Sequence, residues 1–202
     1  MQTHILILAA GASSRMRGGD KCLEPVAGEA LLRRLARLGL GAGCAVTVAL
    51  PPDRPARDAA LDGLAVTRVT VADAAKGMAA SLVAGVSALP PDAAVLLVLA
   101  DLPMLDAADL ATLLAEAAAH PDAILRGADA GGAAGHPVLF PADLRGELLA
   151  LTGDEGARSV LRRHAGRVRL VPLPAGHATT DLDTPEDWAA WRKAGSGAGK
   201  DR

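Results

Sequence analysis

The chain has 202 residues, half of them apolar, and a formal net charge of −2 at pH 7. This length suits a single domain with a sizeable core, and the near-neutral balance argues against a protein that coats nucleic acid or anionic membrane. The longest apolar run, Ala93–Ala100, is too short to cross a bilayer, and one Phe, two Trp and no Tyr offer almost nothing for single-stranded nucleic acid to stack on.

The chain enters a candidate strand, His4–Ala9, with no basic region ahead of an apolar signal core. Its two cysteines, Cys22 and Cys44, share no metal or redox spacing, which is typical of reduced thiols. We therefore expect a cytoplasmic protein.

A loop of small, hydroxylated and cationic residues follows this strand, over residues 10–21 (AGASSRMRGGDK). Small residues let the backbone approach a ligand closely, and their N–H groups can bind anionic oxygens. Arg15 can form paired hydrogen bonds with a phosphate, while Lys21 supplies a mobile charge. The loop matches neither the G-x-G-x-x-G fingerprint nor the Walker pattern. We predict a phosphate site here; the alternative is a surface loop whose cations are solvated.

The next elements are a helical segment, Leu31–Leu40, and two candidate strands, Ala45–Leu50 and Ala65–Val71. The polar face of the helical segment carries cationic residues that we expect to be solvated: Arg33, Arg34 and Arg37.

Gly77 precedes the helical segment Met78–Leu89. A glycine allows close backbone approach, and the free N–H groups of a first helical turn suit an anion or a base edge. Glycine before a helix is also common without any ligand. The side chain of Met78 is expected to belong to the core rather than to a binding site.

The apolar strand Ala94–Ala100 runs directly into Asp101. This carboxylate lies at the edge where open α/β sheets bind ligands, and burying it unpaired would be costly. Asp106 is better placed to cap the helical segment Ala107–Ala119, which leaves Asp101 available. Because Mg²⁺ prefers one or two carboxylates together with phosphate oxygens, we predict that Asp101 binds Mg²⁺; the alternative is a turn carboxylate.

The second half contains candidate strands at Ala123–Arg126, Pro137–Phe140 and Val168–Val171, and one long helical segment, Arg145–His164. Strands that alternate with helices predict a mostly parallel sheet covered on both faces. The chain shows no internal repeat and no linker. We predict one doubly wound α/β domain over residues 1–192, followed by a Gly-rich tail, 193–202, that is expected to be disordered.

Residues 181–188 (DLDTPEDW) contain a helix start. Thr184 can cap the helix, the proline after it suits the first turn, and Asp187 completes a capping box. Asp183 lies just outside the cap, where a second metal-binding oxygen could project. Asp181 would point the same way in an extended segment, so these residues alone leave both candidates open.

Together these segments resemble the MobA-like nucleotidyltransferases from about Ile5 to Trp191. The resemblance rests on the L-A-A-G-x-S-x-R-M signature with Lys21, and on L-A-D-x-P, D-x-D-T-P-E-D, G-M-x-x-S-L, G-x-P-V-L-F and G-D-x-G-A-R elements. Arg17 departs from the pattern, because the family usually has Gly there. The resemblance implies a Rossmann-like nucleotidyltransferase fold and transfer of a nucleotidyl group.

The resemblance also implies roles for the matched positions. Arg15 and Lys21 would balance charge at the α-phosphate during catalysis. Asp101 and Asp183 would hold Mg²⁺, with Asp181 as the alternative second ligand. The nucleotide would contact Ala9, Ala10, Gly11, Ser13, Ser14, Gly77, Ser81 and Asp101.

On the acceptor side, the resemblance implies contacts from His136 and Arg158. Ala10 before Gly11 and the Gly153–Arg158 element point to the cytidylyltransferase branch. Such an enzyme transfers CMP from CTP to the terminal phosphate of molybdopterin, releases pyrophosphate, and makes transient contact with a client molybdoenzyme. The alternatives are another nucleotide such as GTP, another phosphorylated acceptor, or a non-catalytic carrier of the finished cofactor.

Overall fold

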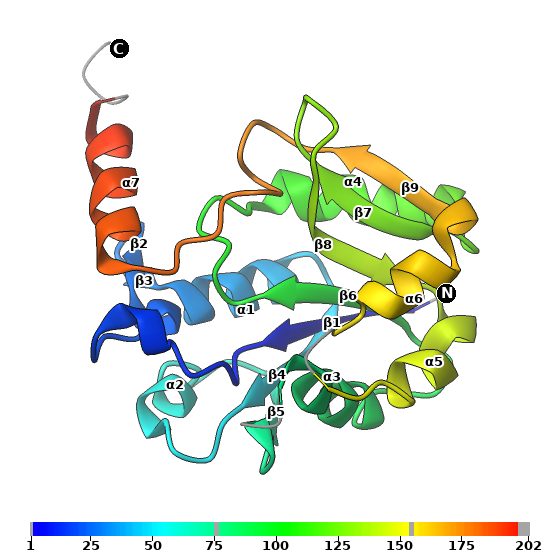
Figure 1. The fold of residues 1–202 in the computed structure, drawn as a ribbon, viewed down its shortest axis with the longest axis horizontal. Coiled ribbons are helices and arrows are strands. Elements are labelled where there is room, and N and C mark those ends of the chain that lie inside the picture. Colours follow the sequence, from blue (N-terminus) through cyan, green and yellow to red (C-terminus); the bar gives the residue numbers. More distant parts are fainter. Residues whose placement is uncertain (1, 75–76, 154–155, 198–202) are drawn as a thin grey trace.

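The computed structural model describes residues 2–74, 77–153 and 156–197 (Figure 1). Its centre is a seven-stranded sheet in the order β5-β4-β1-β6-β8-β7-β9. The strands are β1 (Thr3–Leu8), β4 (Ala45–Leu50), β5 (Thr67–Thr70), β6 (Ala94–Leu99), β7 (Ile124–Ala128), β8 (Ala134–Phe140) and β9 (Val168–Pro172). β8 runs antiparallel to β6 and β7, and the other neighbouring pairs are parallel. The predicted mostly parallel sheet is confirmed.

Helices cover both faces of this sheet, as predicted (Figure 1). One face is covered by α1 (Leu31–Gly41), α4 (Ala107–Ala119) and, through Trp188, α7 (Pro185–Gly197). The other is covered by α3 (Met78–Ser87), α5 (Arg145–Leu149) and α6 (Arg158–Arg163). None of the described helices combines the length and apolar character that crossing a membrane requires.

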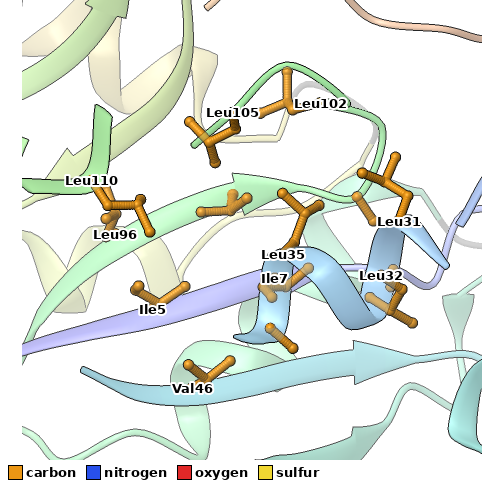
Figure 2. Packing of buried hydrophobic residues seen from close by; sticks show 14 of the residues in the cluster. Ile5, Ile7, Leu31, Leu32, Leu35, Val46, Leu96, Leu102, Leu105 and Leu110 are labelled. Carbon is orange, nitrogen blue, oxygen red and sulfur yellow. The ribbon is translucent and has the colours of Figure 1, made fainter. Parts of the chain in front are cut away.

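The central strand β1 is apolar on both sides because both faces are covered. Ile5 and Ile7 pack with Leu35 of α1 in the first core cluster, which Figure 2 shows from close by. Leu6 points to the opposite cluster, beneath α3. A Cβ at Gly85 of α3 would lie 2.4 Å from the Leu6 Cδ1 atom, so the absence of a side chain there allows α3 to pack closely on the strand.

The predicted long helix Arg145–His164 is wrong, because the structure has two short helices in its place. α5 ends at Leu149 and α6 begins at Arg158. Between them Gly153 has φ 71° and Gly156 has φ 55°, both in the left-handed region that ends helices. The apolar spacing continues on both sides of this break, which is why periodicity alone predicts one helix.

Several short elements lie in segments for which no element is predicted: the hairpin of β2 (Pro25–Val26) and β3 (Glu29–Ala30), the helix α2 (Pro55–Ala59), and the 3₁₀ turns η1 (Ser14–Met16), η2 (Lys21–Leu23), η4 (Ala142–Leu144) and η5 (Ala165–Arg167). α7 lies beside the β2–β3 hairpin (Figure 1). Arg192 of α7 forms an ion pair with Glu24.

The tail and the arginines of α1 also differ from expectation. α7 runs to Gly197 and thus includes residues 193–197 of the tail that composition predicts to be disordered. Residues 198–202 lie outside the described residues. Arg33 is not merely solvated, since it donates to the carbonyls of Ala60 at 3.0 Å and Asp62 at 2.9 Å.

Candidate active site

The site begins at the carboxyl ends of two neighbouring parallel strands. Leu8 of β1 lies opposite Leu99 of β6, so the loop after β1 and the segment that carries Asp101 emerge at the same edge of the sheet. A cavity of about 260 Å³ opens there. Its lining includes six of the predicted nucleotide contacts: Ala9, Ala10, Gly11, Gly77, Ser81 and Asp101.

Two other predicted nucleotide contacts do not line this cavity. Ser13 lies at the start of η1, and its Oγ atom accepts a hydrogen bond from Arg57 at 2.9 Å. Ser14 is exposed within η1. The structure therefore brings the small residues Ala9, Ala10 and Gly11 to the cavity, whereas Ser13 and Ser14 are not part of its lining.

Lys21 is the centre of a cluster of charged side chains. Its Nζ atom lies 2.6 Å from Oδ2 of Asp101 and 2.9 Å from Oδ1 of Asp183. Nη2 of Arg15 lies 2.7 Å from the other oxygen of Asp183. Lys21, Asp101 and Asp183 expose less than a fifth of their side chains, whereas Arg15 is 68% exposed. We call these four residues the carboxylate–lysine cluster.

The cluster holds Lys21 in its charged form. Burial by itself lowers the pKa of Lys21, but attraction to and hydrogen bonds with Asp101 and Asp183 outweigh it, so the pKa lies above its ordinary value. The neighbouring thiol is different. Burial raises the pKa of Cys22 to about 12, so Cys22 stays protonated and is no candidate nucleophile.

The two carboxylates fit a divalent cation. Their oxygens already converge on one positive charge, the ammonium of Lys21. Oδ1 of Asp101 is buried and has no hydrogen-bond partner in the described part of the chain. A buried carboxylate oxygen without a donor is costly unless a cation approaches it, and carboxylates are the protein ligands that Mg²⁺ and Mn²⁺ prefer.

A second acidic group lies in the fold, where Asp106, Asp109 and His177 approach one another within 4.8 Å. Asp106 and Asp109 form the capping box of α4, and Asp109 Oδ2 lies 2.7 Å from Nδ1 of His177. Burial raises the pKa of Asp109, although hydrogen bonds to Asp106 and His177 oppose this. These contacts give the group a structural role in starting α4.

Asp181 and Asp183 occupy different places. Asp183 belongs to the carboxylate–lysine cluster, while Asp181 is exposed and lines a second cavity of about 310 Å³. Leu182 between them is buried. The carboxylates of Asp181 and Asp183 therefore do not point the same way, as an extended segment would require.

The second cavity receives the predicted acceptor contacts. Both His136 and Arg158 line it, together with Arg126. Burial lowers the pKa of His136 to about 4; Arg126 and Arg158 add to this and Asp101 opposes it. His136 is therefore neutral at physiological pH, and the two arginines carry the positive charge of this cavity.

Met78 separates the two cavities and lines both. Its core assignment is wrong: 46% of the residue is exposed, because α3 begins at the cavity rim and not beneath the sheet. Within the Gly153–Arg158 element, a Cβ at Gly156 would lie 2.8 Å from the sulfur of Met78. Asp154 and Glu155 of that element lie outside the described residues.

Two arginines at the site are absent from the sequence-based set. Arg126 ends a predicted strand, and a single cation on an otherwise apolar strand is a signal that could have pointed to it. Arg57 is buried beneath the loop that follows β1, and nothing in its local pattern distinguishes it from a surface arginine.

The departure at Arg17 has a backbone explanation. Arg17 has φ 49°, in the left-handed region that favours glycine, which accounts for Gly at this place in the family pattern. Its side chain pairs with Glu186 at 2.7 Å and is 70% exposed. The loop thus keeps the left-handed turn without glycine.

Both the sequence and the fold of the chain have relatives among known proteins. Residues 5–168 match the model of the MobA-like NTP transferase domain. The chain is 30% identical over 194 residues to nicotine blue oxidoreductase of Paenarthrobacter nicotinovorans, covering 90% of this chain and 92% of that protein. The crystal structure of Rv0371c from Mycobacterium tuberculosis H37Rv has a TM-score of 0.76 and 30% identity, covering 96% of this chain and 99% of that one. A structure of Rv0371C in complex with manganese has a TM-score of 0.78 and 27% identity, covering 96% and 100%.

Proposed function

Because the chain belongs to the MobA-like NTP transferase family and is a nucleotidyltransferase, we propose that it transfers CMP from CTP to the terminal phosphate of molybdopterin. The observation that carries this proposal is the carboxylate–lysine cluster beside a cavity lined by small residues. Cations and paired carboxylates at one strand edge are what transfer at an α-phosphate requires.

The proposed reaction is an in-line displacement. An oxygen of the acceptor phosphate forms a bond to the α-phosphorus, the bond to the β-phosphate oxygen breaks, and pyrophosphate leaves with that electron pair. The acceptor oxygen is already anionic, so no general base is needed. Arg15 and Lys21 neutralise charge as the α-phosphorus becomes crowded, and the small-residue loop positions the triphosphate.

Asp101 and Asp183 are the residues that would hold Mg²⁺. When bound, such an ion neutralises charge on the phosphates and the leaving group. The manganese in the related mycobacterial structure supports a divalent cation in this family. Until the nucleotide enters, Lys21 keeps the two carboxylates paired, and its ammonium is then available to the phosphates.

The choice of CTP and of a pterin acceptor rests on features of the sequence and of the second cavity. Ala10 and the Gly153–Arg158 element resemble the cytidylyltransferase branch. Arg126 and Arg158 suit an anionic acceptor, and apolar walls that include Phe140 suit a flat ring. Transient contact with a client molybdoenzyme belongs to the same proposal. So does a cytoplasmic location, for which free thiols are usual.

The test is pyrophosphate release from CTP, GTP, ATP and UTP, each with Mg²⁺ and molybdopterin. We expect release with CTP, and loss of at least about 100-fold in kcat for Asp183→Asn. Asp181→Asn is the matched control, because Asp181 lies two residues away and outside the carboxylate–lysine cluster; since Asp181 lines the proposed acceptor cavity, this variant should change the KM for the acceptor and retain kcat. Pyrophosphate release from GTP and from none of the other nucleotides would overturn the choice of CTP. If none of the four nucleotides releases pyrophosphate, the proposed transfer itself is overturned.

A second candidate comes from one relative. The protein of Paenarthrobacter nicotinovorans, 30% identical to this chain, is named an oxidoreductase. An oxidoreductase with this fold would need a redox cofactor, and its activity would not depend on a cation held by Asp101 and Asp183. Oxidation of NADH or NADPH by a coloured aromatic acceptor, unaffected by EDTA and by Asp183→Asn, would favour this candidate. If the protein shows neither nucleotidyl transfer nor oxidation but binds the finished cofactor tightly, the result would favour a non-catalytic carrier.

A further inference from the structure

We propose that Arg57 is a positioning residue that holds the loop of residues 9–21 in the form that accepts the phosphates of a nucleotide. This inference rests on the proposed nucleotidyl transfer at the same site. Arg57 lies on α2, in a segment for which the sequence predicts no element, and its side chain is 0% exposed. A fully buried guanidinium is rare and needs partners for its donors.

Among the described residues, every hydrogen-bond partner of the Arg57 side chain belongs to this loop. Nη1 donates to the carbonyl oxygen of Ala9 at 2.5 Å and to that of Gly11 at 2.7 Å. Nη2 donates to Oγ of Ser13 at 2.9 Å, and Nε donates to Oδ2 of Asp20 at 2.7 Å. The guanidinium therefore joins the beginning and the end of the loop.

These contacts constrain the direction of the backbone N–H groups of the loop. In a trans peptide the C=O and the following N–H point in opposite directions. Because the carbonyls of Ala9 and Gly11 point at Arg57, the N–H groups of Ala10 and Ala12 are turned away from it. Within the described residues neither N–H group has a hydrogen-bond partner. Unpaired N–H groups turned away from a buried cation are what an anionic phosphate binds.

Arg57 also reaches Lys21 through Asp20. The second carboxylate oxygen of Asp20 accepts a hydrogen bond from the backbone N–H of Cys22 at 3.0 Å, which fixes the chain on both sides of Lys21. The same carboxylate neutralises the buried guanidinium. A lysine in this place could neutralise Asp20 but could not reach four acceptors in separate directions.

The experiment compares Arg57→Met and Arg57→Lys with Arg33→Met. Arg33 is the matched control, because it also donates two hydrogen bonds to backbone carbonyls near α2 but does not touch the loop. The first measurement is amide hydrogen exchange without nucleotide at Cys22 and Gly19, whose N–H groups are bonded within the loop. We expect exchange there to quicken about 10-fold or more in both Arg57 variants, and not in Arg33→Met, after correction for global stability.

The second measurement is steady-state kinetics. We expect the KM for the nucleotide to rise about 10-fold or more in the Arg57 variants, with an unchanged KM for the acceptor. Equal loop exchange in the Arg57 and Arg33 variants, a normal nucleotide KM, or wild-type behaviour of Arg57→Lys would overturn the proposal. If Arg57→Met does not fold, Arg57→Lys decides. If the wild-type protein transfers no nucleotide, the proposed function fails, whereas the exchange result still reports on the loop.

Discussion

Arg15 and Arg17 offer a test of the charge assignment within one loop. Their side chains are almost equally exposed, at 68% and 70%, and each forms one ion pair at 2.7 Å. Arg15 pairs with Asp183 of the carboxylate–lysine cluster, whereas Arg17 pairs with Glu186 on the first turn of α7. The two arginines therefore differ in position relative to the cavity and hardly at all in exposure.

We predict that Arg15→Ala lowers kcat for pyrophosphate release by about 10²–10³, because it removes a positioned charge at the reacting phosphate. Arg17→Ala should change kcat by less than about fivefold, as expected for a surface ion pair. Both variants should unfold at the same denaturant concentration as the wild type. Equal losses of kcat would show that the loop acts only through its overall charge.

His136 provides a prediction on pH and stability. Unfolded His136 binds a proton near pH 6.5, whereas in the folded cavity burial lowers its pKa to about 4. Between these values the unfolded chain binds more protons than the folded one, so stability falls as the pH falls. The contribution is present above pH 6.5 and is lost progressively toward pH 4.

We therefore expect the free energy of unfolding to fall between pH 7 and pH 5 by about 2 kcal/mol more in the wild type than in His136→Gln. Urea denaturation of both proteins at each pH measures the difference. The comparison removes the contributions of other titrating groups, including His4, whose pKa is also lowered by burial. An identical pH dependence in the two proteins would mean that water reaches the imidazole.

At the scale of elements, the contact between α3 and β1 fixes where the cavity floor lies. A Cβ at Gly85 would lie 2.4 Å from Cδ1 and 3.1 Å from Cγ of Leu6, which is fully buried and has no free space to enter. We predict that Gly85→Ala destabilises the protein by about 1–3 kcal/mol through overpacking. Gly146 is the control, since it is exposed in the helix α5 and no atom lies within 4 Å of a Cβ there.

Gly146→Ala should leave stability unchanged or raise it by about 0.5–1 kcal/mol, because alanine loses less backbone entropy in a helix. Denaturant unfolding of both variants measures the contrast. A stable Gly85→Ala protein would show that α3 can shift along the sheet, and the nucleotide KM of that variant would then report the movement of Ser81, which lines the first cavity.

Sequence predicts an element well when its apolar pattern belongs to that element alone and a local signal marks its ends. β4 and α4 begin and end at the predicted residues, since apolar runs and a capping box mark their bounds. The prediction of one helix over Arg145–His164 is wrong because its apolar residues belong to two helices, α5 and α6. The chain between them turns through glycines in the left-handed region. The β2–β3 hairpin fails for another reason: strands of two residues are too short to show a period.

At the scale of the whole molecule, the rule that ligands bind at carboxyl ends of strands brings Lys21 and Asp101 to one edge of the sheet. Asp183 comes from the far end of the chain, and only the family motif favoured it over Asp181. Arg57 could not be predicted, because the burial of a charge depends on tertiary contacts that no local pattern records. Sequence patterns therefore predict functional side chains that follow the ends of strands, and they do not predict buried side chains such as Arg57 that hold a loop in place.

The carboxylate–lysine cluster joins three distant segments of the chain, at Lys21, Asp101 and Asp183. A ligand that binds there only in the folded protein therefore raises the free energy of unfolding of the whole molecule. A triphosphate beside Asp101 and Asp183 meets two negative charges unless a divalent cation binds with it. We predict that CTP with Mg²⁺, at about 100 times its Kd, raises the free energy of unfolding by about 2.7 kcal/mol. CTP with EDTA, or Mg²⁺ alone, should raise it by less than half as much.

Asp101→Asn and Asp183→Asn should remove most of this stabilisation, whereas Asp181→Asn should keep it, because Asp181 lines the second cavity instead. Thermal or urea unfolding with and without ligands measures all four proteins in one series. Stabilisation by CTP that is equal with Mg²⁺ and with EDTA would mean that Lys21 alone balances the phosphates, and Asp101 and Asp183 would then serve only to hold Lys21 in place.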